Sequence, residues 1–253
     1  MSVFDAFDLY NVLFLDVETT PGTPDFEDLG EEMQELWGIK CRGILRKTQD
    51  ELEYDEIAET YNTRAGIYSE FGKIICVSVG FLTRQPGNTE PLLRLKSYTS
   101  HVEAALLDDF SDLLTRHFNA PEKFALCGHN IKEFDIPYIC RRMLVNQLPL
   151  PKMLDIAGKK PWETKHLLDT MEMWKFGDLK NYTSLRLLAA VFDFPSPKDD
   201  MDGSQVASVY WEERDLDRIA RYCEKDVLAT AQLYLKMKRL PILRDDQVII
   251  VNK

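Results

Sequence analysis

Acidic residues at three places in the sequence could together bind divalent cations. Asp16 and Glu18, in F-L-D-V-E-T-T, are two residues apart, so on a strand both carboxylates point to one face and Val17 points to the other. Two neighbouring carboxylates repel each other unless a cation or a proton offsets their charge. The pair alone is weak evidence, because acids at strand ends are common and mostly solvated.

The other two segments also have structural explanations. In G-H-N-I-K-E-F-D, Asn130 and Asp135 stand where a strand passes into a helix, a place where acids also favour the helix dipole. In R-Y-C-E-K-D-V, Tyr222 and Asp226 are four residues apart and share one helix face, and this spacing alone favours a core tyrosine. We interpret His129 as a structural hydrogen-bonding residue and leave it out of the metal ligands.

The strands and helices that must position these residues can be predicted from periodicity. Apolar or β-rich runs predict strands at 11–16, 71–83, 92–98, 124–127 and 167–174, and Thr19-Thr20-Pro21-Gly22 predicts a break after the first. Three consecutive strands followed by alternating elements predict an α/β fold, with a mixed sheet of an antiparallel meander and parallel strands flanked by helices.

Helices are predicted from residue 100 and over 134–145, 183–191 and 216–238. For the first of them we expect Ser100 and Glu103 to form a capping box. Its apolar face is expected to consist of Val102, Leu106, Phe110 and Leu113/Leu114.

A long insertion separates the first two strands, at about residues 21–69. It is rich in acids and also carries Lys40, Arg42, Arg46 and Lys47. A solvated helical hairpin is the simpler interpretation. A lid or substrate guide is the alternative, because the insertion leaves directly from the strand end that carries the first two acids. We predict that residues 1–253 form a single domain with this insertion.

Composition limits the classes of protein that need to be considered. A hydrophobic content of 45% with 29% charged residues is typical of a globular protein. Five scattered cysteines without a C-x-x-C pair suggest neither a disulfide framework nor a zinc ribbon, and with no leader or spanning segment we predict a cytoplasmic protein with no membrane partner. The net charge of −11 argues against coating long nucleic acid but allows gripping a chain end.

The order and spacing of the three acidic segments resemble the three exonuclease motifs of the DEDD superfamily, in its tyrosine-bearing branch. Neighbouring residues are similar to the exonuclease domain of family B DNA polymerases, notably Tyr210-Trp211 and the stretch from Lys198 to Gly203. The likeness covers most of Tyr10 to Lys236 and leaves no room for a polymerase palm or thumb. The chain therefore resembles stand-alone predicted exonucleases.

This resemblance implies a ribonuclease H-like fold and a metal-dependent 3'-5' exonuclease acting on the 3' end of single-stranded DNA to release nucleoside 5'-monophosphates. It implies two Mg2+ or Mn2+ ions, held by the carboxylates of Asp16, Glu18, Asp135 and Asp226. Tyr222 would complete the catalytic residues. Since the usual pKa of tyrosine is near ~10, it would stay protonated and orient the attacking water.

Substrate contacts are expected from Thr19, Asn130 and Phe134. Trp174 and Tyr182 could also stack on a terminal base, or belong to the core. A basic group precedes the fifth strand and could touch phosphates, or be a solvated loop: Lys152, Lys159, Lys160 and Lys165. Two alternatives stay open, a ribonuclease D-like exoribonuclease and a catalytically silent nucleic-acid-binding module. The sequence points to no protein partner.

Overall fold

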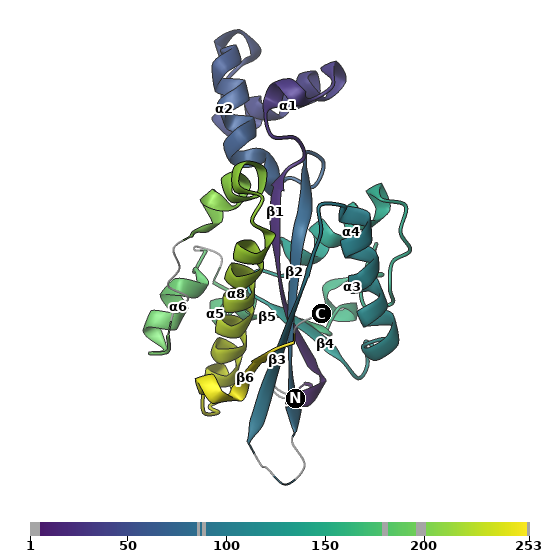
Figure 1. The fold of residues 1–253 in the computed structure, drawn as a ribbon, viewed down its shortest axis with the longest axis vertical. Coiled ribbons are helices and arrows are strands. Elements are labelled where there is room, and N and C mark those ends of the chain that lie inside the picture. The colour runs from purple at the N-terminus through teal and green to yellow at the C-terminus, as the bar shows by residue number, and fades with distance from the viewer. Residues whose placement is uncertain (1–5, 85–86, 88–89, 179–181, 196–200, 252–253) are drawn as a thin grey trace.

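A mixed sheet of six strands organises the chain, in the order β5-β4-β1-β2-β3-β6 (Figure 1). The computed structural model describes residues 6–84, 87, 90–178, 182–195 and 201–251, so part of the Lys198 to Gly203 stretch lies outside the described residues. The strands are β1 (Val12–Pro21), β2 (Gly72–Arg84), β3 (Pro91–Thr99), β4 (Ala125–Gly128), β5 (Leu167–Asp169) and β6 (Val248–Ile250). The first three form an antiparallel meander. The other three pair in parallel, β4 with β1, β5 with β4, and β6 with β3.

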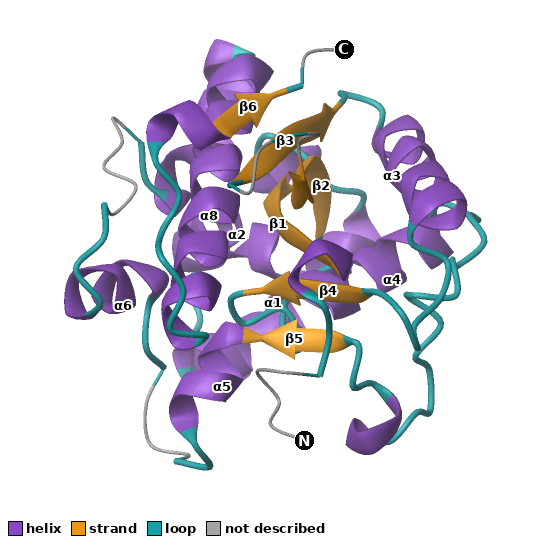
Figure 2. Ribbon diagram, turned by 90° about the horizontal axis from the view of Figure 1, so that it is seen from below, coloured by secondary structure: helices purple, strands orange, loops and turns teal. Residues whose placement is uncertain are grey.

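Helices cover both faces of this sheet, with α8 on one side and α3 and α4 on the other (Figures 1 and 2). The helices are α1 (Glu31–Leu45), α2 (Tyr54–Arg64), α3 (Glu103–His117), α4 (Asp135–Val145), α5 (Thr170–Lys175), α6 (Leu185–Val191), α7 (Val206–Ser208) and α8 (Leu216–Met237). A π-helical turn, Val209–Glu213, precedes α8. The arrangement confirms the predicted α/β fold and is that of a ribonuclease H-like domain.

Alternation along β1 divides the core into two layers. Leu13, Leu15 and Val17 pack with the apolar residues of α3 and α4. Val12 and Phe14 point the other way and pack against α8. Because side chains alternate along a strand, the α8-facing row continues from Phe14 into Asp16 and Glu18.

Small residues on β2 let α8 approach the sheet closely. Cys76, Ser78 and Gly80 lie opposite Glu18, Asp16 and Phe14 and thus face the same helix. A Cβ at Gly80 would meet Val227 Cγ1 of α8 at 3.0 Å. A larger residue here would push α8 away from β1.

Three predicted details are wrong. The first strand does not break at Thr19, because Thr20 is fully buried and Pro21 pairs at the very end of β1, where a missing N–H costs little. The predicted strand at 167–174 ends at Asp169, whose carboxylate accepts the backbone N–H groups of Met171 and Glu172 and starts α5. A short apolar run cannot by itself distinguish a strand from a buried helix.

The predicted capping box of the third helix is also absent. The helix begins at Glu103, and Ser100 accepts only the N–H of Val102, a residue that is 62% exposed. The Glu103 carboxylate instead accepts the N–H of Ile74 at 2.7 Å and pairs with Arg142 at 2.6 Å. A buried ion pair therefore replaced the local cap. The rest of the predicted apolar face is buried or partly buried.

The segment between β1 and β2 holds α1 and α2, which project beyond the sheet (Figure 1). It has a small core of its own around Trp37, whose ring packs edge-on against Tyr61 at 5.4 Å and Phe71 at 4.9 Å. Lys47 of the α1 end pairs with Glu56 of α2 at 2.5 Å. These contacts make the insertion a packed helical pair.

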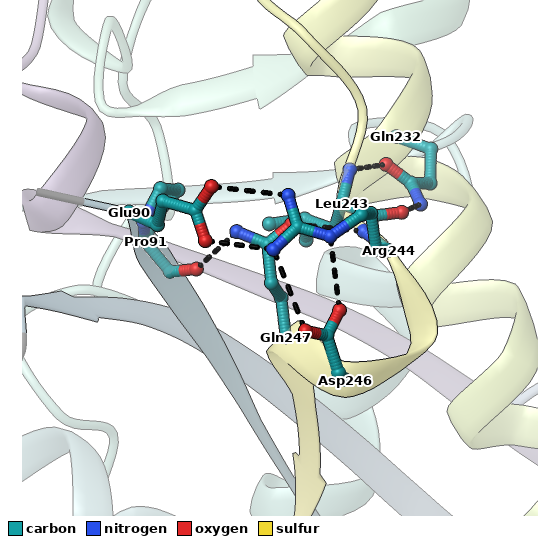
Figure 3. A network of polar contacts seen from close by, with 7 residues as sticks. All are labelled: Glu90, Pro91, Gln232, Leu243, Arg244, Asp246 and Gln247. Carbon is teal, nitrogen blue, oxygen red and sulfur yellow. Dashed lines mark hydrogen bonds and ion pairs between the residues drawn. The ribbon is translucent and has the colours of Figure 1, made fainter. Parts of the chain in front are cut away.

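The last strand is fastened to the body by side chains (Figure 3). Arg244 binds Glu90 at 2.7 Å, and Gln232 of α8 exchanges two hydrogen bonds of 2.8 Å with the backbone of Leu243. Gln247 donates to the carbonyl of Pro91. The chain end thereby ties α8 to β3. A membrane-crossing helix is absent from the part of the chain that the structure describes.

Candidate active site

The first pair of acids stands where one edge of β1 opens. β4 pairs with β1 only from Val12 to Phe14, whereas β2 pairs with it as far as Pro21. Asp16 and Glu18 therefore lie on the α8 face of a strand that has lost one neighbour. The register shifts between Glu18 and Thr19, which turns the strand just beyond the second acid.

Helix α8 brings Tyr222 and Asp226 over this row. Their spacing of four residues places them on one helix face, and the phenol of Tyr222 donates a hydrogen bond to the Asp226 carboxylate. On the next face, the thiol of Cys223 is 3.4 Å from both the carbonyl oxygen and Oδ2 of Asp16. The helix is thus held directly against the acid-bearing strand.

The last carboxylate comes from the opposite side of the sheet. Asp135 is the first residue of α4 and is 3% exposed. Its carboxylate accepts the backbone N–H of Val17 as well as its own. This bond requires the open edge of β1, so the shortness of β4 is what admits Asp135 to the site.

These residues meet in one open cleft of about 380 Å³. The lining consists of Asp16, Val17, Glu18, His129, Asn130, Phe134, Asp135, Tyr182, Gly203, Tyr222 and Asp226. All five predicted catalytic residues are therefore brought together, with two of the three predicted substrate contacts. The third, Thr19, is not among the lining residues, and its side chain bonds to the Tyr138 hydroxyl.

Burial and mutual repulsion strongly perturb the acids. Desolvation, followed by repulsion from the neighbouring carboxylates, raises the pKa of both Asp16 and Glu18 well above the usual range. Burial also raises the pKa of Asp135 to about 7 and that of Asp226 to about 6, although the bond from Tyr222 acts in the opposite direction on Asp226. Without a compensating cation the cluster retains protons near neutral pH.

One carboxylate that the motifs did not reveal organises the floor of the site. Asp169, 3% exposed at the end of β5, accepts the backbone N–H groups of Asn130 at 3.0 Å and Lys132 at 3.1 Å. It also caps α5. Asn130 has a φ of 67°, so the Asp169 bonds hold a left-handed turn that leads to Asp135.

His129 is a structural residue in this turn. Its two ring nitrogens contact Thr170 Oγ1 at 2.9 Å and the carbonyl of Thr183 at 2.8 Å. It thereby fixes the chain beside Tyr182, which is 67% exposed at the cleft rim. This agrees with its omission from the predicted ligands.

The remaining candidates lie elsewhere. Trp174 packs on Phe192, with ring centroids 5.6 Å apart, in a cluster behind α8, which favours a core role. None of the four lysines before β5 lines the cleft among the described residues. Lys160 sits over the ring of Trp162 instead, 5.0 Å from its centroid.

The family of predicted 3'-5' exonucleases related to the exonuclease domain of PolB matches residues 67–245, well over half of the sequence. The chain belongs to this family. The resemblance seen in the sequence is thereby confirmed, and the family is one of nucleic-acid hydrolases. No curated protein matches the chain.

The matched residues include the second and third acidic segments of this exonuclease-family chain but begin after Asp16 and Glu18. The family match therefore says nothing about the first pair. In the structure, β1 leads into the insertion, and its two acids line the same cleft as Tyr222 and Asp226 of α8.

Proposed function

We propose that the protein is a metal-dependent 3'-5' exonuclease that hydrolyses the terminal phosphodiester bond of single-stranded DNA and releases nucleoside 5'-monophosphates. The observation that carries the proposal is the convergence of four carboxylates and Tyr222, from β1, α4 and α8, in one open cleft. DNA is favoured because the family is related to the exonuclease domain of PolB.

The donor groups fit Mg2+ or Mn2+. Glu18 is 8% exposed, and its carboxylate has no hydrogen-bond partner among the described residues. Asn130 Oδ1 is also buried without a partner. Buried oxygens left in this state are costly unless a ligand satisfies them, and carboxylate oxygens are the ligands that hard divalent cations prefer. Asp16, Glu18, Asp135 and Asp226 would hold two such ions.

When bound, the ions would acidify the attacking water and stabilise the leaving 3' oxygen. The protein's own groups contribute orientation. Burial, with the charges of Asp226, Glu18 and Asp16, raises the pKa of Tyr222 far above the usual range, so its phenol stays protonated. With the hydroxyl directed at Asp226, the lone pairs of the phenol oxygen are available to accept a hydrogen bond from the attacking water and align it.

The cleft suits the end of a chain better than its middle. A volume of about 380 Å³ is at the small end of ligand pockets and is comparable to one nucleotide. Phe134 and Tyr182 border it and can stack on the terminal base, and Asn130, which also lines the cleft, would contact the terminal nucleotide. Contact with a single nucleotide also agrees with the net charge of −11.

Paired oligonucleotides test this function. Single-stranded DNA labelled at the 5' end should be shortened one nucleotide at a time in Mg2+ or Mn2+, and a blocked 3' end should prevent it. EDTA should stop the reaction. Preferential degradation of an RNA of the same sequence would replace DNA by RNA as the substrate, and no degradation of either polymer would contradict an enzymatic role.

Asp169→Asn should reduce kcat/KM by about 10-fold to 100-fold, the loss typical of groups that orient metal ligands. The amide keeps the shape of the side chain. However, its NH2 group would face a backbone N–H group whose hydrogen bond the carboxylate oxygen accepts in the wild type. Asp8→Asn is the matched control, because Asp8 caps the short turn before β1 and does not line the cleft. An equal loss of activity in both variants, or a loss explained by unfolding, would contradict the positioning role.

A cytoplasmic location belongs to the same proposal. It is supported by the five cysteines, all of which are free thiols in the structure. Free thiols are typical of a reducing compartment.

A further inference from the structure

We infer that Asp16, Glu18 and Cys223 form a binding site for thiophilic divalent cations such as Zn2+, which inhibit the enzyme by taking the place of the hard ion. This inference rests on the proposed function and adds a regulatory property to the same cleft. Its basis is geometric: one donor atom from each of the three side chains lies within 4.8 Å of the other two.

The cysteine is directed into the carboxylates by the packing of α8. Its thiol lies 3.4 Å from Asp16 Oδ2 and also shares a hydrogen bond with the thiol of Cys76. Cys76 is the cross-strand neighbour of Glu18. The thiol and the two carboxylates therefore sit on facing elements that are already in contact.

The carboxylate of Glu18 is buried without a hydrogen-bond partner among the described residues and is therefore available as a ligand. Glu18 is nine-tenths buried and lines the cleft. Ligand atoms of a tetrahedral zinc lie about 3.5 Å apart, given bonds of ~2.0–2.3 Å. Small rotations of these side chains, which move the donor atoms by about 1 Å, would bring all three donors within bonding distance of one ion. Water would be the fourth ligand.

Ligand chemistry separates the two kinds of cation. Mg2+ binds oxygen and avoids sulfur, so it leaves Cys223 protonated. Zn2+ or Cd2+ forms a bond to Sγ in place of the S–H bond, and the proton passes to solvent. Because the affinity of mixed sites for Zn2+ exceeds that for Mn2+, the thiophilic ion wins at equal concentration. Asp16 would be a ligand both of the thiophilic ion and of the hard ions. A bound Zn2+ would therefore prevent the arrangement of hard ions that the reaction requires.

Titration with Cd2+ tests the site without relying on activity. The wild-type protein should develop the ultraviolet charge-transfer absorption of a cadmium–thiolate bond with one equivalent of Cd2+, and Cys223→Ser should lose it. Cys140→Ser, a cysteine of α4 that does not line the cleft, is the matched control and should keep it. Thermal melting of each variant establishes that it is folded.

Inhibition by Zn2+ provides the second measurement. Relative to its own rate in Mg2+, Cys223→Ser should need at least about 10-fold more Zn2+ for half-inhibition than the wild type, because one ligand is lost. A wild-type protein without the cadmium band, or a band that persists in folded Cys223→Ser, would overturn the inference. Oligonucleotide cleavage without the band leaves the exonuclease standing, and the band without cleavage leaves the metal site standing.

Discussion

Asp16→Asn is expected to lower the rate of single-stranded DNA cleavage by at least about 100-fold. Removal of a group that stabilises charge mainly in the transition state typically has an effect of this size. The amide is nearly isosteric with the carboxylate, so the contact with Cys223 can persist while the negative charge is lost. Asp226→Asn should have a similar effect, because it removes a carboxylate and replaces the charged acceptor of the Tyr222 hydroxyl by a neutral amide oxygen. Product ladders from a 5'-labelled oligonucleotide measure the rates.

Asp112→Asn serves as the control for this loss. Asp112 is an exposed acid on α3 that, among the described residues, pairs with Arg116, one turn along the same helix. Its substitution removes the same charge from the protein and should leave the rate within about 2-fold, since surface pairs contribute little. Retained activity in purified, folded Asp16→Asn protein would remove the first acidic segment from the mechanism.

Glu18→Gln should abolish cleavage and at the same time raise the melting temperature of the metal-free protein. The folded-state pKa of Glu18 is raised by burial and by Asp16, so ionisation of this side chain opposes folding. For an acid raised in this way, the folded state holds a proton that the unfolded chain has released, and stability falls as pH rises through the interval between the two pKa values. The pKa values of Asp226, about 6, and of Asp135, about 7, are also raised, so these two acids add to the loss of stability of the metal-free protein between about pH 4 and neutrality.

The measurement is thermal unfolding in EDTA at about pH 5 and about pH 8. We expect the variant to gain roughly 2–4 °C over the wild type at the higher pH for each kcal/mol of repulsion removed, and little at the lower. Mg2+ should stabilise the wild type more than the variant at the higher pH. Glu122→Gln, an exposed charge on the loop before β4, should show neither effect. A lower melting temperature for Glu18→Gln at both pH values would contradict the predicted repulsion.

The acid-bearing segments were predictable because their spacing is tied to local structure. Two residues on a strand and four on a helix each fix a common face, and the structure keeps both periods, in Asp16 with Glu18 and in Tyr222 with Asp226. Asp135 was found only through its order relative to the other segments. The alternation of the core along β1 was likewise visible in the sequence.

What escaped prediction depends on partners distant in the chain. The role of Glu103 is set by Arg142 of α4 and the N–H of Ile74, about thirty to forty residues away, which outcompeted a local cap. Asp169 was hidden for a similar reason, since its bonds to Asn130 and Lys132 cross from one strand end to another. Its only local signal is its place after the paired leucines of β5, directly before a helix.

The end of β1 and its edge beside β4 differ in how many sequence changes they tolerate. Beyond Pro21 the chain accommodates a packed pair of helices while the carboxylates keep their places. At the edge beside β4 there is no such freedom, because a side chain at Gly128 would meet Ile131 at 2.8 Å and a longer β4 would occupy the edge that Val17 offers to Asp135. Mutational drift and engineered insertions should therefore be tolerated near the helical pair and eliminated around residue 128.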